Sequence, residues 1–552
     1  MILTHLTYTL SEPIQTIPIS VNDNGCALKI NSQTGRSLLH FFFKSDLILL
    51  FFICKKLVML ILPMATVQII LLILVFLSLA FLMFLRKIPA LLALPLMAFL
   101  IPVISGVSVS DTVQLVLGLG ATRLNEAYTI AIFGSMLSIL LQKTGVAESF
   151  IKIGAELSGD KPWTIAFIML ILIALLFTTL GGLGAIIMVA TVVLPIMSSA
   201  GIGPLTTVGV FLIGLSMGGI LNVGNWAVYI TVLGLTVEQV RSFALIMFVI
   251  TFVIALVYLT IQLYRDGHDM NFKKIFLRSV GIAVIVSILG FLYQNLGTDA
   301  KIGIGEVLAS VGLFLKWLAG ILIGSLFLVS VIRLFSKNKS EAIHWTSYFT
   351  PIIPLFLILV FNINFIAAFI VGLIYGFLST YRKNSLNILI RSMLEGGAVV
   401  MPAVALMLGI GMLLNAVMGP SAPHNAAYAN GWPVLNLLQP VMKEIVPHNA
   451  LVYILLFTVA APLALYRGPL NVWGMGFGIA AIFLASGMIP GAIMGLLLSV
   501  GQIQGISDPT NTQNVWLANE MRVDVQKVLW NTIPYTWLIA VLGLILSALM
   551  FY

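Results

Sequence analysis

The two halves of this chain repeat each other, and each copy is interrupted in the middle of an apolar run. Aligning Pro204 with Pro490 sets an offset of 286 (490 minus 204), and the register then holds without a gap for more than forty residues. The polar stretch Asn222-Val-Gly-Asn225 of the first half therefore aligns with Asp508-Pro-Thr-Asn511 of the second. Helical segments interrupted at matching places in two halves are typical of proteins that move a solute through a site at the membrane midplane.

Composition excludes a soluble globular protein. The chain is 60% hydrophobic and 9% charged, with a mean hydropathy of +1.11, and apolar runs of the ~20 residues that span a bilayer recur along it. The net charge of +9 comes from Lys and Arg in short loops, which agrees with the positive-inside rule and indicates no nucleic-acid partner. Cys26 and Cys54 have no metal or redox spacing. We therefore expect an all-α polytopic membrane protein.

The chain divides by composition into four parts. Residues 1–63 are predicted to be an N-terminal extension that is non-native or disordered, with the natural start at Met59 or Met64; the alternative is a real extension with one weak span. Residues 64–264 are predicted to form the first transporter repeat, 265–346 connecting helices and cytoplasmic loops, and 347–552 the second repeat. We expect about ten to twelve transmembrane helices, including a span near 277–296, in two inverted repeats with broken helices and two re-entrant hairpins.

Polar and glycine residues inside the apolar runs are the candidate site. Freed backbone amides and helix N-termini suit an anion, and one Arg facing a carboxylate would bind it through two hydrogen bonds. The predicted substrate-binding residues are Gly181, Gly182, Gly184, Asn225, Arg467, Gly468, Asn471, Asn511 and Thr512. Oxygen-bearing side chains near the breaks suit a small hard cation. The predicted Na⁺ ligands are Asn222, Asn225, Ser507, Asp508 and Asn511.

Several of these residues also have a structural interpretation. Arg467 could flank a turn at the membrane interface, and Asp508 could be a helix N-cap in an Asp-Pro turn. Glu126 and Glu395 follow Arg123 and Arg391 at spacings that favour pairing along a helix face. Thr236 and Gln239 are predicted to form a capping box.

Three stretches resemble a known group of transporters. They are Thr178-Thr-Leu-Gly-Gly-Leu-Gly through Pro195-Ile-Met, Phe133-Gly-Ser through Thr-Gly145, and Ser507-Asp-Pro-Thr-Asn-Thr512. They are similar to the ion transporter superfamily, which includes the citrate, gluconate and C4-dicarboxylate permeases and, more distantly, the divalent-anion:sodium symporters. The last stretch resembles a Ser-Asn-Thr signature with the Asn-Thr pair displaced. The resemblance implies two inverted repeats, each with a re-entrant hairpin and a broken helix, and often a dimer that works as an elevator.

Together these features predict a secondary active transporter and no enzyme. It would import a small organic anion, such as citrate, gluconate or a C4-dicarboxylate, coupled to Na⁺ or H⁺ by alternating access. The alternative is a Na⁺/H⁺ antiporter of the same architecture, with Asp508 as the exchanged carboxylate. We expect no cofactor beyond Na⁺ as a coupling ion, a homodimer in the lipid bilayer, and a multi-pass location in the cytoplasmic membrane of a prokaryote.

Overall fold

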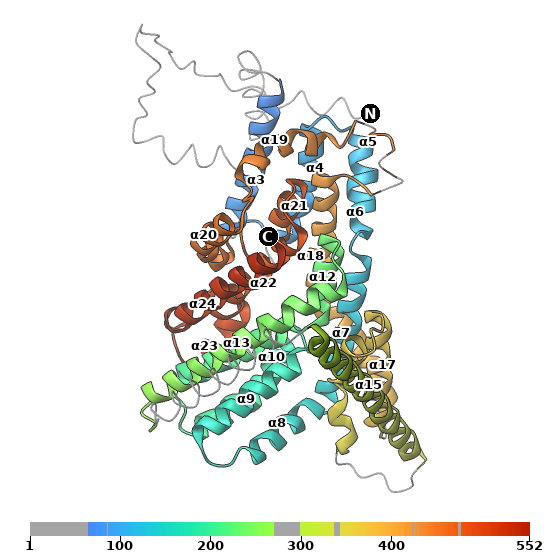
Figure 1. Cartoon of the computed structure of the whole chain (residues 1–552), viewed down its shortest axis with the longest axis vertical. Coiled ribbons are helices and arrows are strands. Elements are labelled where there is room, and N and C mark those ends of the chain that lie inside the picture. Colours follow the sequence, from blue (N-terminus) through green and yellow to red (C-terminus); the bar gives the residue numbers. More distant parts are fainter. Residues whose placement is uncertain are drawn as a thin grey trace, which may run out of the picture. The chain divides into compact units, whose positions relative to one another are not determined.

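The computed structural model describes residues 64–552, except 86, 270–297, 336–342, 383, 422–423, 425, 429 and 473–475. The chain divides after Val67 into two compact units, and the second, Gln68–Tyr552, carries the features below. The described residues form helices and connecting segments without strands (Figure 1). The predicted extension 1–63 and the predicted span near 277–296 lie outside the described residues.

The helices of the first half follow the apolar runs and the interruptions between them. They are α3 (Met64–Phe84), α4 (Ala90–Ile104), α5 (Val109–Asp111), the π-helical η1 (Thr112–Gly118), α6 (Leu119–Thr122), α7 (Asn125–Lys143), α8 (Val146–Leu157), α9 (Pro162–Phe177), α10 (Gly182–Ser199), α11 (Pro204–Ile220), α12 (Val223–Leu233) and α13 (Val237–Arg265). The predicted capping box at the start of α13 is confirmed, because the Thr236 and Gln239 side chains each accept from the other's backbone amide.

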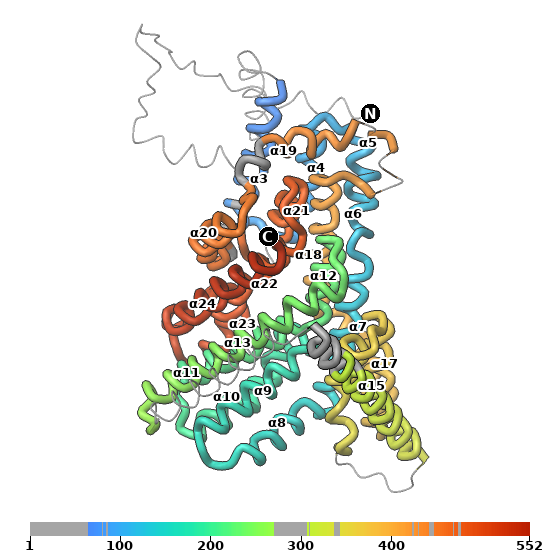
Figure 2. The backbone as a smooth tube through the Cα atoms, viewed as in Figure 1, coloured from blue at the N-terminus to red at the C-terminus, as the bar shows by residue number. Residues whose placement is uncertain are grey.

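The second half begins after α15 (Thr298–Leu334). Its elements are the 3-10 helix η2 (Trp345–Phe349), α16 (Ile353–Leu359), α17 (Phe365–Ser379), α18 (Ser385–Met418), α19 (Pro433–Ile445), α20 (Ala450–Ala460), the 3-10 helix η3 (Ala461–Arg467), α21 (Phe477–Ala485), α22 (Pro490–Ser507), α23 (Thr512–Glu520) and α24 (Val525–Phe551). The two halves can be followed by colour in Figure 2, from blue to green and from yellow to red.

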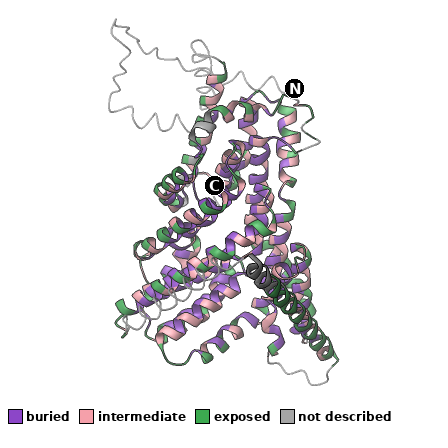
Figure 3. Cartoon of the chain, viewed as in Figure 1, coloured by how far each residue is buried: buried purple, intermediate pink, exposed green. Residues whose placement is uncertain are grey.

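Helix length and composition establish a multi-pass membrane protein. Among the described residues, seven helices are long and apolar enough to cross a membrane, or up to eight if the bent pair α11 and α12 counts as one span. Shorter apolar helices of 10–17 residues accompany them. The helix α15 exposes most of its large apolar side chains (Figure 3), as a helix facing lipid does. The expected all-α polytopic class is therefore confirmed.

The 286-residue offset relates helices as well as residues. It carries α11 onto α22, α12 onto α23, α13 onto α24, and the second half of α10 onto α21. Equivalent contacts then occur in crossed pairs: α11 contacts α24 while α13 contacts α22, and α10 contacts α23 while α12 contacts α21. Reciprocal contacts of this kind are the pattern of a two-fold axis, in which each unit presents the same surface to the other. A translation along the chain would not produce them.

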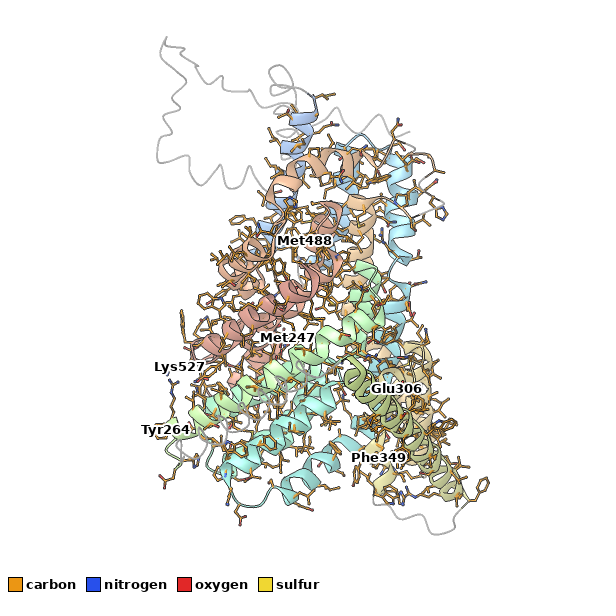
Figure 4. All side chains as sticks on the ribbon, viewed as in Figure 1. Met247, Tyr264, Glu306, Phe349, Met488 and Lys527 are labelled. Carbon is orange, nitrogen blue, oxygen red and sulfur yellow. The ribbon has the colours of Figure 1, made fainter. Side chains whose placement is uncertain are left out.

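The core around this axis is a group of four helices, α11, α13, α22 and α24, in which every pair is in contact. Glycine allows the closest approaches: Gly209 of α11 lies against the hydroxyl of Tyr258, and its repeat equivalent, Gly495 of α22, against the hydroxyl of Ser547. Met247 of α13 is buried in this group, whereas Tyr264 near the end of the same helix is exposed (Figure 4). Small residues commonly permit such close packing between membrane helices.

Two predicted pairs along helix faces are wrong. Glu395 of α18 pairs with Lys143 of α7 at 2.8 Å instead of with Arg391. Arg123 donates to the Asn415 side chain, at 2.5 Å, and to the Gly419 carbonyl instead of pairing with Glu126. Both differences have one cause, which is that α18 lies along α6 and α7, so partners from a distant segment displace the local ones.

Candidate functional site

A cavity of about 800 Å³ lies where the interrupted segments of the two halves meet. It is lined by the start of α10, the junction of α11 and α12, the segment before α21, and the junction of α22 and α23. The polar side chains in its described lining are Ser216, Asn222, Asn225, Tyr229, Asn471, Gln502, Gln504, Asn511 and Gln513. No acidic, basic or histidine side chain is among the described lining residues. The cavity is therefore polar, rich in carboxamides and uncharged over its described surface.

Asn222 forms the junction between α11 and α12, which are bent by 50°. Its Oδ1 accepts from the backbone amides of Gly224, at 3.0 Å, and Asn225, at 3.4 Å, and so caps α12. Its Nδ2 donates to the carbonyl oxygens of Phe177, the last residue of α9, and Leu180, in the loop that follows, at 3.0 and 3.4 Å. The carboxamide therefore caps α12 through its oxygen and joins the break to the loop before α10 through its nitrogen.

Asp508 occupies the equivalent position at the junction of α22 and α23. Its Oδ1 accepts from the backbone amide of Tyr466, at 3.1 Å, and from the amide and hydroxyl of Thr510, at 2.8 and 2.7 Å. Tyr466 and Thr510 are the repeat equivalents of Leu180 and Gly224, so equivalent residues are joined in both halves. The bond to the preceding loop differs in direction, because Asn222 donates to the Leu180 carbonyl whereas Asp508 accepts from the Tyr466 amide. Asp508 is fully buried and is not a lining residue of the cavity. The bond from the Thr510 amide forms a turn around Asp508-Pro509, but the N-cap of α23 is Asn511, so the N-cap alternative for Asp508 is wrong.

Asn225 and Asn511 are a second equivalent pair, and both line the cavity. Asn225 Nδ2 donates to the Gly219 carbonyl and Asn511 Nδ2 to the Gln504 carbonyl, each at 3.0 Å. Because a carbonyl can only accept, these bonds fix the orientation of both carboxamides. Neither Oδ1 has a hydrogen-bond partner among the described residues, so each half contributes one acceptor to the cavity.

The start of α10 contributes donors. Gly181 precedes the helix in extended conformation, and no side chain caps this end. Gly182 has a φ of +83°, a conformation that favours glycine. A Cβ placed on Gly181 would meet no atom within 4 Å, so the first amides of α10 are open to the cavity. An uncapped helix N-terminus that faces open space is suited to an anion.

The segment after η3 completes the lining. Asn471 and Gln504 are each only 6% exposed and both line the cavity. Gln504 Oε1 accepts from the Val472 amide at 2.7 Å, which joins this segment to α22. Gly468 lies closer to the Leu463 carbonyl than a Cβ would allow. The Arg467 backbone ends η3, whereas its side chain lies outside the described part of the chain.

The predicted site residues therefore separate into two groups. The cavity brings together Gly181, Gly182, Asn222, Asn225, Asn471 and Asn511, whereas Gly184, Gly468, Ser507, Asp508 and Thr512 are not among its described lining residues. Ser507 is buried, and its hydroxyl bonds those of Thr532 and Thr536, each at 2.8 Å. Thr512 begins α23 and is exposed.

The lining also includes Ser216, Gln502, Gln504 and Gln513, which are not among the residues predicted from the sequence. Ser216 and Gln502 are separated by 286 residues, so they are repeat equivalents. A polar residue at the same position of an apolar run in both halves was the signal that could have found them.

Comparisons with known proteins give little further guidance. A comparison with protein-family models finds no match, and a comparison with curated protein sequences finds none either. Among solved structures, the chain is similar to the YdaH transporter of Alcanivorax borkumensis, with a TM-score of 0.43 and 15% identity. The match covers 80% of this chain and 88% of that one. Similarity at this level does not bear on substrate or mechanism.

Proposed function

We propose that the chain is a secondary active transporter that imports a small organic anion, such as citrate, gluconate or a C4-dicarboxylate, coupled to Na⁺ or H⁺ by alternating access. The observation that carries the proposal is the cavity between two helix breaks at equivalent positions, one from each half. Paired breaks of this kind surround the substrate sites of secondary transporters. We further propose that the protein works as a homodimer in the cytoplasmic membrane of a prokaryote.

The proposal assigns the carboxylate of the substrate to the start of α10. The open amides there offer hydrogen bonds and the positive end of the helix dipole, and Gly181 leaves room for a ligand oxygen to approach. Arg467 remains the proposed cationic partner. The coupling ion is proposed to interact with oxygens near the two breaks, where Asn225 and Asn511 each present a carboxamide oxygen. No cofactor is proposed beyond this ion.

The antiporter alternative has less support. It requires Asp508 to exchange ions with the cavity, whereas Asp508 is fully buried, is not a lining residue, and accepts three hydrogen bonds through Oδ1. These contacts favour a role in holding the break.

The proposal is tested by uptake of labelled citrate, succinate, malate and gluconate into proteoliposomes, with and without imposed Na⁺ and pH gradients. Gly181→Ala would be measured beside the native chain. The substitution has room in the fold but places a methyl group beside the open amides, so we expect uptake to fall about tenfold, the effect of losing about 1.4 kcal/mol of binding.

Gly324→Ala is the matched control, because Gly324 of α15 also has no atom within 4 Å of an added Cβ and does not line the cavity. Accumulation of one anion that depends on a gradient and is lost only in Gly181→Ala supports the proposal. Folded protein that accumulates none of the anions but exchanges Na⁺ for H⁺ overturns it in favour of the antiporter.

A further inference from the structure

Over its described lining, the cavity offers few positive charges and many uncharged hydrogen-bonding side chains. This combination restricts the class of ligand that the cavity can bind. Over its described lining, the positive element is the open start of α10, since no Lys, Arg or His side chain is present. The start of α12 is already capped by Asn222. The start of α23 has no side-chain cap, but the buried Asp508 carboxyl group stands one turn before it and opposes the positive end of its dipole. One helix end, equivalent to about half a unit charge, together with Arg467 as its proposed cationic partner, matches one carboxylate better than two or three.

The acceptors of the cavity are poorly matched to further carboxylates. Asn225 and Asn511 keep their Nδ2 on backbone carbonyls and present Oδ1. A second carboxylate placed against these oxygens would put acceptor against acceptor, which leaves both desolvated and unpaired. A group that carries a donor hydrogen satisfies them.

A donor without a partner lies close to these acceptors. The Gln504 side chain is buried, with 6% of the residue exposed, and its Oε1 accepts from the Val472 amide. Gln504 lines the cavity, and its Nε2 has no acceptor among the described residues. A ligand must therefore accept from Gln504 and donate to Asn225 and Asn511, and a hydroxyl group can do both.

From these contacts we infer that the ligand is a polyhydroxylated monocarboxylate, with its carboxylate at the start of α10 and its hydroxyl groups against Asn225, Asn511 and Gln504. This inference rests on the proposed function and narrows it to one class of anion. An alkyl carboxylate of the same length would leave buried carboxamides unpaired, and sites built to hydrogen-bond a hydroxyl strongly reject analogues that lack it. The cavity volume is within the range of small-molecule sites.

Four related compounds test this inference in proteoliposomes by uptake and by competition. Gluconate has one carboxylate and several hydroxyl groups, hexanoate lacks the hydroxyl groups, glucarate adds a second carboxylate, and sorbitol lacks the carboxylate. We expect gluconate to be taken up, and to compete, at least about tenfold better than each of the other three. Hexanoate or glucarate equal to gluconate overturns the inference but leaves anion transport standing, and sorbitol equal to gluconate overturns both the inference and the role of the carboxylate. Absence of uptake for every anion overturns the proposed function itself.

A matched pair of substitutions tests the assigned residue. Gln504→Glu keeps an oxygen for the Val472 amide but replaces the free donor with an acceptor, so we expect gluconate uptake to fall at least about tenfold. Gln526→Glu makes the same change at an exposed carboxamide whose Oε1 accepts from the Tyr466 hydroxyl, and we expect no loss. The unfolding temperature of each variant, with and without gluconate, separates weakened binding from weakened folding. A Gln504→Glu variant that is stabilised by gluconate and transports it as the native chain does overturns the inference.

Discussion

Ser216 donates a hydrogen bond of 2.6 Å to Oε1 of Gln502, and the two residues hold the same position in the two repeats. Equivalent residues can touch each other only beside the axis that relates their repeats. Both line the cavity, so the axis passes next to it. In a transporter that alternates between two orientations, the two halves must separate or slide past each other here. A substitution at either residue can therefore weaken the contact between the halves selectively.

Ser216→Ala should slow uptake about fivefold, because Gln502 Oε1 loses its partner and a hydrogen bond contributes about 1 kcal/mol. Gln502 keeps its other bond, from Nε2 to the Leu498 carbonyl at 3.0 Å, so the fold is expected to persist. Initial uptake rates in proteoliposomes measure the effect. Ser199→Ala, at an exposed serine of α10, should behave as the native protein does, and an equal loss in both variants would contradict a specific role for the contact.

Asp508→Asn and Asp508→Ala should differ strongly in stability. Asparagine retains an oxygen for the amides of Tyr466 and Thr510, and asparagine is the native residue at the equivalent position 222. We expect a cost of about 1 kcal/mol for Asn and about 2–3 kcal/mol for Ala, which leaves buried amides unpaired. Thermal unfolding of the detergent-solubilised variants measures this difference. Loss of transport in a well-folded Asp508→Asn variant would show that the carboxylate itself is required and would favour the antiporter.

Gly209→Ala should destabilise the four-helix core. An added Cβ would overlap the Tyr258 hydroxyl, which is fixed by a bond of 2.6 Å to Asn531, and overpacking of this kind costs about 1–3 kcal/mol. The unfolding temperature should therefore fall. Gly324→Ala on α15 meets no atom and should raise or preserve it, since alanine favours a helix over glycine. Equal unfolding temperatures for the two variants would refute the close approach of α11 and α13.

Acid should weaken the start of η2 through His344. Burial, and then the positive charge of Arg333, lower the pKa of this histidine below its ordinary value. Its Nδ1 lies 2.8 Å from the Thr346 hydroxyl and accepts from the Thr346 amide, which requires a neutral ring nitrogen. The unfolded chain therefore binds a proton that the folded chain resists, and stability declines as the pH falls below about 6.5.

Unfolding temperatures between pH 8 and pH 5 measure the effect of His344. His344→Asn keeps a side-chain acceptor at the N-cap without titrating near this range, so its decline on acidification should be smaller than that of the native chain. Parallel curves for the two proteins would exclude His344 as the cause.

The sequence predicted the parts of the site that depend on the repeat and on local chemistry. Asn222, Asn225 and Asn511 were recognisable because carboxamides interrupt an apolar run at matching positions, and such residues are costly within a membrane unless they have partners. Ser216 was not recognised, because one serine in an apolar helix has the same local pattern as a packing residue. The pairs Lys143–Glu395 and Arg123–Asn415 depend on the contact of α18 with α6 and α7, which no local spacing contains.

The paired contacts Gly209–Tyr258 and Gly495–Ser547 have a consequence for how the two halves can change. In an assembly of two identical copies, one substitution alters both equivalent contacts at once, and the new residue must suit both. Within a single polypeptide, each contact is encoded separately. The two equivalent glycines therefore face hydroxyl groups at positions that the offset of 286 does not relate, Tyr258 in the first half and Ser547 in the second, a divergence that identical subunits could not accumulate one side at a time.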